Sequence, residues 1–295
     1  MSYLIGYRHY PGSVAKFFVR AFRRLGHRVI TVGPWTEELP WAPGGDFRDE
    51  VEVPDIPLDW DIGEFRVKQL VGMVPKVSAV ISFDAGFRLI GTLNDAPTVL
   101  YGTDPHVMPY PYRNSYDYFF SAQHGHGIWV PLGYDPEYHK LSKEINEADR
   151  PTDVCFIGQI DRPGYSNRAT SRDVFNRSGL NTYFATGLLG ESYRLAYNNS
   201  KIAFNWSSSW DIPMRLWEGM AMGCCTLTNR LPHMEDLGFV ENRDYLAFDN
   251  VDEAVGVARK ALSDGTWMEV AQNGKKAVKH HSYDDRVRDI LNHLD

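Results

Sequence analysis

The sequence predicts an α/β protein in which two domains each contain a parallel sheet. Short apolar runs recur along the whole chain, as at residues 77–82 and 154–158, and amphipathic stretches or loop-sized gaps separate them. Runs that are apolar throughout are typical of parallel strands that helices cover on both faces. A chain of 295 residues also exceeds one comfortable hydrophobic core. We therefore expect two Rossmann-like domains whose parallel sheets face a central cleft.

The N-terminal half opens with the pattern of a strand, a loop and a helix. Residues 3–7 form the first apolar run. Ser13 is placed to cap a helix whose apolar residues recur at i, i+3, i+4, i+7 and i+8 from Val14, before Gly26 ends the pattern. Further strands are expected at 28–32, 77–82, 97–101 and 118–121.

A polar segment at residues 142–152 separates the two halves. It is rich in charged residues and contains Pro151, which is typical of a linker. We therefore expect domains at residues 1–141 and 142–295, with a last helix that can pack back on the N-terminal domain. Strands of the second domain are expected at 154–158, 181–185, 201–206, 224–228 and 245–248, and a helix from Glu253 with Asp249, Asn250 or Asp252 as its cap.

Composition and charge exclude several classes of protein. The net charge of −7 gives no global reason to bind a polyanion. Three cysteines, two of them adjacent at Cys224 and Cys225, provide neither a disulfide framework nor zinc spacing. No run approaches the ~20 apolar residues of a membrane span, so we expect a cytoplasmic protein. No Gly-x-Gly-x-x-Gly or Walker motif follows a strand, which disfavours nicotinamide and P-loop enzymes.

The helix that follows the strand at 201–206 has the most informative start. Ligands of open α/β sheets bind outside the carboxyl ends of the strands, and a helix N-terminus suits a diphosphate. Arg215 lies in the first turn, after Pro213, and its guanidinium can donate two hydrogen bonds to a phosphate. Glu218 can accept hydrogen bonds from ribose hydroxyls. The alternative is that Asp211 only caps this helix and that Arg215 and Glu218 form a surface ion pair.

The segment Asp211-Ile-Pro-Met-Arg-Leu-Trp-Glu-Gly-Met-Ala-Met-Gly resembles the signature of group 1 glycosyltransferases of the GT-B fold. Within that group it is most similar to the branch of the spore maturation protein CgeB. The resemblance covers roughly residues 118–290. Further matches are Phe156-Ile157-Gly158, Arg168, Glu235-Asp236-Leu237, Asn273-Gly274 and His281-Ser282-Tyr283 with Arg286.

The resemblance implies transfer of a sugar from a nucleotide-diphosphate sugar to a hydroxyl acceptor, with retention of configuration and without a metal or other cofactor. It implies that Glu218 binds the donor ribose, that Gly158 lets the chain pass close to the donor, and that Arg168 or Arg162 is a second cationic contact. The broader group carries two glutamates separated by seven residues. Here Trp210 takes the first position, so either Asp211 reaches the transferred sugar or Trp210 and backbone groups replace that role.

Other loops supply candidates for the acceptor side. His9, Tyr10 and Gly12 follow the first strand and can contact acceptor or donor phosphate, although His9 can equally be a mobile surface histidine. Asp104 and His106 can accept a proton or bind sugar hydroxyls, or Asp104-Pro105 can simply form a turn. The sequence gives less support for a role of three further residues. Asp84 can line the cleft or cap a helix near Ala85. His124 and His126 can be interpreted as a metal-binding pair, but a third ligand at recognisable spacing is missing.

The acceptor is left open by the sequence: a glycan, a small molecule, a protein or a hydroxymethylated base of phage-type DNA. Arg20, Arg23 and Arg24 share one helix face and would suit DNA. Two other functions fit the same fold. One is a non-catalytic protein that binds nucleotide sugars or belongs to a coat, and the other is a nucleotide-sugar epimerase.

Overall fold

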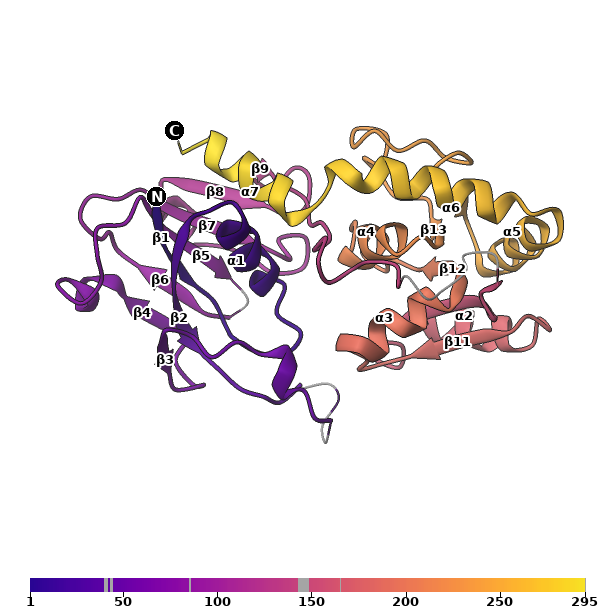
Figure 1. Cartoon of the computed structure of the whole chain (residues 1–295), viewed down its shortest axis with the longest axis horizontal. Helices are drawn as coiled ribbons and strands as arrows, with labels where there is room; N and C mark the ends of the chain where they lie inside the picture. The colour runs from indigo at the N-terminus through magenta and orange to yellow at the C-terminus, as the bar shows by residue number, and fades with distance from the viewer. Residues whose placement is uncertain (40–41, 43–44, 85, 143–148, 165, 295) are drawn as a thin grey trace. The chain divides into compact units, whose positions relative to one another are not determined.

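The structure is a computed structural model that describes residues 1–39, 42, 45–84, 86–142, 149–164 and 166–294. The chain divides into two compact units, which we call unit 1 (Met1–Leu132 and Tyr283–Asp295) and unit 2 (Gly133–Ser282). The contacts therefore divide the chain at 132/133, whereas the sequence suggested 141/142. Residues 143–148 of the expected linker lie outside the described residues. Figure 1 shows the elements of both units.

Unit 1 contains a parallel sheet of seven strands in the order β3-β2-β1-β5-β7-β8-β9. The chain runs from β1 outward to β3 and then returns to the other side of β1 with β5. The switch point of this sheet, where ligands of open α/β sheets bind, therefore lies between β1 and β5. The strands are β1 (Ser2–Gly6), β2 (Arg28–Pro34), β3 (Ile56–Leu58), β5 (Ala79–Asp84), β7 (Thr98–Gly102), β8 (Tyr118–Ser121) and β9 (Ile128–Trp129).

Two helices that are far apart in the sequence pack together in unit 1. They are α1 (Ala15–Arg24) and α7 (Tyr283–Asn292), drawn in indigo and yellow in Figure 1. The ring of Phe18 lies 4.7 Å from that of Phe83 and 4.8 Å from that of Tyr283. The N-cap of α1 is Val14, with no capping hydrogen bond from a side chain, so the expected Ser13 cap is wrong.

A second, two-stranded sheet of unit 1 packs into a large apolar cluster that also contains residues of β1, β2 and β5. It contains β4 (Glu64–Arg66) and β6 (Arg88–Ile90), and the 3-10 helix η2 (Val67–Leu70) adds to the same cluster. Leu89 of β6 packs so close to β1 that a Cβ on Gly6 would lie 2.5 Å from it. We expected helices on both faces of the main sheet, and this is wrong where the two-stranded sheet packs against it. The helix expected near Ala85 is also wrong, although Ala85 itself is outside the described residues. Its place is taken by β6, which begins three residues later.

Unit 2 contains a parallel sheet of five strands in the order β11-β10-β12-β13-β14. The chain steps from β10 to β11 and then crosses to the other side of β10 with β12. The switch point of unit 2 therefore lies between β10 and β12. The strands are β10 (Thr152–Ile157), β11 (Thr182–Ala185), β12 (Ser200–Asn205), β13 (Cys225–Asn229) and β14 (Leu246–Phe248).

Helices cover both faces of the unit 2 sheet, as the apolar runs predict. Val154 and Phe156 point into one cluster, with residues of α2 (Ser166–Asn176), α5 (Val251–Asp264) and α6 (Thr266–Ala277). The alternate residues Cys155 and Ile157 point into the other, with Tyr197 of α3 (Gly190–Asn198) and Met222, which follows α4 (Met214–Ala221). Asn250 caps α5 by accepting from Glu253 N at 3.0 Å. No helix of the described residues is long and apolar enough to cross a membrane.

Candidate functional site

Two guanidinium groups lie over the ring of Phe156, close to the end of β10. The Cζ of Arg215 is 5.3 Å and that of Arg168 is 5.7 Å from the ring centroid. Phe156 is fully buried, and the negative face of an aromatic ring attracts cations. Arg215 comes from α4 and Arg168 from α2. Two cations from separate helices are therefore gathered beside the switch point of unit 2.

Arg215 is held in place by the strand ends around it. Its Nη1 donates to Oδ1 of Asn205 at 2.8 Å, and Nδ2 of Asn205 donates to Oγ1 of Thr228 at 2.9 Å. A Cβ on Gly158 would lie 3.1 Å from Nη2 of Arg215, which explains why glycine suits this position. A guanidinium carries five N–H donors, so one bond to Asn205 leaves donors for an anion.

The two candidates for a second cation have different surroundings. Arg168 is buried, and it donates from Nε to the carbonyl of Trp206 at 2.9 Å and from Nη1 to that of Gln159 at 3.1 Å. It therefore ties together the loops that follow β10 and β12. Arg162 is exposed and donates to Oε1 of Gln159 at 3.2 Å.

The loop between β12 and α4 is closed by side chains. The backbone N–H of Ser207 donates to Oδ1 of Asn229 at 2.8 Å, and Nδ2 of Asn229 donates to the carbonyl of Ser207 at 3.1 Å. The hydroxyl of Ser207 also donates to Asp211 across the loop. The N-cap of α4 is Pro213, without a side-chain bond, so the alternative that Asp211 caps this helix is wrong. Between these anchors, Trp210 is 64% exposed with a φ of +59°.

Glu218 lies in the interior of unit 2 with an exposed fraction of 1%. The hydroxyl of Tyr193 donates to its Oε2, and Nε2 of His139 lies 3.2 Å from its Oε1. Since Arg215 bonds to Asn205, the expected alternative of an Arg215–Glu218 surface ion pair is wrong. Sequence reasoning missed both His139 and Tyr193, because neither stands at helical spacing from Glu218.

The first loop of unit 1 contains a buried histidine. His9 is 2% exposed and stacks on Tyr7 with ring centroids 3.6 Å apart, so it is not a mobile surface residue. Burial lowers the pKa of His9 to about 4, which keeps the ring neutral at physiological pH. Gly12 lies in the turn that follows, where Nζ of Lys16 donates to the carbonyl of Pro11 at 2.8 Å.

Tyr10 and Asp104 lie on two loops of unit 1, near enough for the charge of Asp104 to act on the Tyr10 hydroxyl. Burial, followed by the charge of Asp104, raises the pKa of Tyr10 to about 12. The carbonyl of Asp104 accepts from Val107 N and Met108 N at 3.1 and 2.9 Å, so the expected turn forms while the side chain is exposed. His106 lies in the same turn and is partly buried. Asp84 ends β5, but its side chain is outside the described residues.

The remaining candidates have partners of their own. Arg20 and Arg23 each lie 2.8 Å from the carboxylate of Glu52, and Arg24 lies 2.6 Å from that of Asp284. The three arginines of the expected basic face of α1 are therefore paired with two carboxylates of unit 1, which reduces its positive charge.

Possible metal ligands are dispersed in the part of the chain that the structure describes. No three His, Cys, Asp or Glu residues are grouped there in a way that could hold a metal ion. His124 packs edge-on against Trp129 at 5.1 Å. The expectation that the chain contains no Asp-x-Asp triplet, the usual metal-binding signal of the other glycosyltransferase architecture, is wrong, because Asp59-Trp60-Asp61 falls in a turn after β3.

Solved structures with the same architecture identify the fold. An α-glucosyltransferase in complex with UDP and a 13-mer DNA with a central A:G mismatch is 11% identical, with a TM-score of 0.63 over 99% of both chains. A glycosyltransferase from Rickettsia africae ESF-5 is 10% identical, with a TM-score of 0.61 over 99% of this chain and 97% of that one. Sucrose-phosphate synthase from Thermosynechococcus elongatus is 8% identical, with a TM-score of 0.57 over 100% and 98%. The fold is that of the GT-B glycosyltransferases.

The family follows from the sequence of the second half. The profile of a family described as "Glycosyl transferase-like" matches residues 143–292, just over half of the chain. The chain therefore belongs to this glycosyltransferase family, and the expectation of a glycosyltransferase is confirmed. A comparison with curated protein sequences finds no match.

Proposed function

We propose that the chain transfers a sugar from a nucleoside-diphosphate sugar to a hydroxyl acceptor and that the diphosphate binds at the switch point of unit 2. The observation that carries this proposal is the placement of Arg215. Asn205 fixes one of its N–H groups, Gly158 leaves it room, and the partly buried guanidinium belongs to the first turn of α4. A helix N-terminus and a fixed cation together suit an anion.

The proposed site stabilises the charge that forms during transfer. A bond forms between the acceptor oxygen and the anomeric carbon, the bond from that carbon to the diphosphate breaks, and the acceptor hydroxyl loses its proton. Negative charge grows on the diphosphate, where preorganised donors lower the barrier most. Asp104, His106 and Asp211 are the proposed proton acceptors or sugar contacts. Retention of configuration and independence of metals are part of the proposal.

Nucleotide binding and product analysis test this function. A thermal-shift screen of UDP, ADP, GDP and CDP should show a stabilising ligand, because a ligand that binds only the folded state raises its stability. The matching nucleotide sugar should then release its nucleoside diphosphate in the presence of an acceptor, and EDTA should leave the rate unchanged. Binding without release would favour the non-catalytic alternative, and a new sugar nucleotide formed without an acceptor would favour an epimerase. Absence of binding by all four would contradict the proposal.

The identity of the acceptor and the branch of the family are also parts of the proposal. The DNA alternative is supported by the likeness to the DNA-bound α-glucosyltransferase. The ion pairs of Arg20, Arg23 and Arg24 weaken the original argument for it, which was the positive charge of these arginines. A salt-dependent affinity for duplex DNA with hydroxymethylated bases would support it. We propose in addition that the chain belongs to the CgeB-like branch, acts in the cytoplasm and needs no cofactor besides the donor.

A further inference from the structure

Three residues from separate segments of unit 2 meet inside it. Glu218 lies in α4, Tyr193 in α3 and His139 in the segment that precedes β10. Tyr193 OH donates to Oε2 of the carboxylate and His139 Nε2 lies 3.2 Å from Oε1. Glu218 and His139 have side chains that are each 1% exposed. The two oxygens of one buried carboxylate therefore face different neighbours.

The position of the proton on His139 follows from its other nitrogen. The backbone N–H of Asp135 donates to Nδ1 of His139 at 3.0 Å, so Nδ1 carries no proton. In a neutral imidazole the proton is then on Nε2, which is the nitrogen that faces Glu218. The carboxylate of Asp135 in turn accepts from Glu137 N at 2.9 Å and Tyr138 N at 3.0 Å. The turn at 135–139 thus fixes both the ring and its tautomer.

The hydroxyl of Tyr193 also stays protonated, so it can donate a hydrogen bond. Burial, followed by the charge of Glu218, raises the pKa of Tyr193 well above its usual value. Tyr193 therefore remains protonated and donates to the carboxylate. Its ring packs at 4.9 Å from that of Tyr197, the next turn of α3.

A buried carboxylate that accepts a hydrogen bond from Tyr193 on one oxygen and has the imidazole of His139 3.2 Å from the other cannot rotate freely about its last bond. Each oxygen still has acceptor capacity, since a carboxylate offers about four lone-pair sites. Two parallel acceptors at a fixed orientation match the two adjacent hydroxyls of a ribose, as acidic residues do in other nucleotide sites.

On this basis, and resting on the proposed function, we propose that His139 and Tyr193 are positioning residues that orient Glu218 toward the 2′,3′-diol of the donor nucleotide. They set the preference for a ribonucleotide over a deoxyribonucleotide and do not touch the transferred sugar. His139 lies outside the segment that matches the family profile, which begins at residue 143.

The test compares a ribonucleotide with its 2′-deoxy form. We first choose the tightest-binding ligand among UDP, ADP, GDP and CDP. Calorimetry then measures the affinity of wild type, Tyr193→Phe and His139→Gln for this ligand and for its 2′-deoxy form. Loss of a hydrogen bond to a charged group costs roughly tenfold in affinity or more. Wild type should prefer the ribonucleotide by about that factor. Tyr193→Phe should weaken binding of the ribonucleotide alone, so the ratio of the two affinities should fall toward one. His139→Gln keeps an N–H donor and should retain part of the preference.

Controls separate positioning from folding. Tyr183→Phe, on an exposed residue of β11, and His280→Ala, on an exposed residue that follows α6, should keep the wild-type preference. In a Glu218→Gln background, Tyr193→Phe should change the preference no further. The proposal is overturned if folded Tyr193→Phe keeps the preference, if it weakens both nucleotides equally, or if wild type shows no preference. Absence of binding by all four diphosphates would overturn the proposed function instead.

Discussion

The side chain of Arg215 in the first turn of α4 is hydrogen-bonded to Asn205, the last residue of β12, at 2.8 Å. Asn205 is buried and is itself bonded to Thr228 of β13. Hydrogen bonds therefore connect the guanidinium of Arg215 to the ends of two neighbouring strands, β12 and β13. Such a cation pays little of its side-chain entropy when an anion binds, because the protein has already ordered it.

Arg215→Lys should weaken nucleoside-diphosphate binding while the fold persists. Lysine has a single ammonium group and lacks the planar fork, so it cannot hold Asn205 and a phosphate in the same geometry. We expect a loss of roughly 10- to 100-fold in affinity, the range for hydrogen bonds to charged groups. Calorimetric titration measures it.

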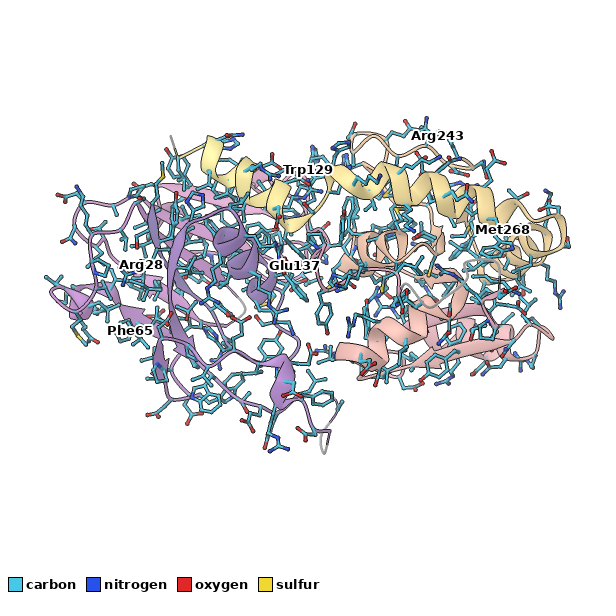
Figure 2. The ribbon with its side chains drawn as sticks, viewed as in Figure 1. Arg28, Phe65, Trp129, Glu137, Arg243 and Met268 are labelled. Atoms are coloured by element: carbon cyan, nitrogen blue, oxygen red, sulfur yellow. The ribbon has the colours of Figure 1, made fainter. Side chains whose placement is uncertain are left out.

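The matched control for this change is Arg243→Lys. Arg243 projects from the loop before β14, where it pairs with Asp244 at 2.7 Å (Figure 2). Its side chain is largely exposed, so the control should bind nucleotides like wild type. Equal affinities of wild type and Arg215→Lys would move the diphosphate away from the first turn of α4.

Gly158→Ala should weaken the same ligand by displacing Arg215. The new Cβ would lie 3.1 Å from Nη2, so the guanidinium must shift by a few tenths of an ångström. The free energy of unfolding should also fall by about 1 kcal/mol, because the same Cβ would lie 3.2 Å from Cζ of the buried Phe156 ring. Affinity and urea unfolding are measured together.

Gly256→Ala is the control for the glycine change. Gly256 lies in α5, and an added Cβ would meet nothing within 4 Å. Alanine there should stabilise the protein by about 1 kcal/mol through helix propensity and leave binding unchanged. A Gly158→Ala protein with wild-type affinity would show that Arg215 does not need its present position.

Trp210→Asn should stabilise the protein. The backbone of Trp210 has a φ of +59°, and its side chain is 64% exposed. The left-handed region costs an ordinary residue about 1–2 kcal/mol, whereas asparagine visits it routinely. We expect the free energy of unfolding in urea to rise by about 1 kcal/mol. A fall would mean that contacts of the indole outweigh the backbone strain.

His9 should make stability depend on pH. Its pKa is lowered from 6.5 to about 4 in the folded protein, mainly by burial. The unfolded state therefore binds the proton more tightly. The contribution is fully present above pH ~6.5 and is lost as the pH falls toward ~4. About 2 kcal/mol should be lost between pH 7 and pH 5.

Urea unfolding of wild type and His9→Gln at both pH values isolates this contribution. Glutamine does not titrate, so the stability of the variant should fall less between pH 7 and pH 5. Parallel losses in the two proteins would show that other groups cause the pH dependence.

The sequence by itself determined the elements that local pattern encodes. The apolar run at 118–121 is β8 with the same bounds, and the amphipathic pattern from Val14 is α1. The strand and helix start around Arg215 fall where the spacing predicts. Periodicity reports the burial of a face, and burial of a face is what forms a strand or a helix, so these features are readable without a structure.

Only the tertiary structure decided which groups are partners. Spacing within α4 suggested that Arg215 pairs with Glu218, yet Arg215 bonds to Asn205 and Glu218 is held by Tyr193, 25 residues earlier, and by His139. Likewise, the sequence suggested that the last helix can pack on the N-terminal domain, but it did not indicate that its partner is the first helix, through Phe18 and Tyr283. Such choices depend on how the chain crosses over in the sheet and on which polar groups are buried together, and no local pattern records either one.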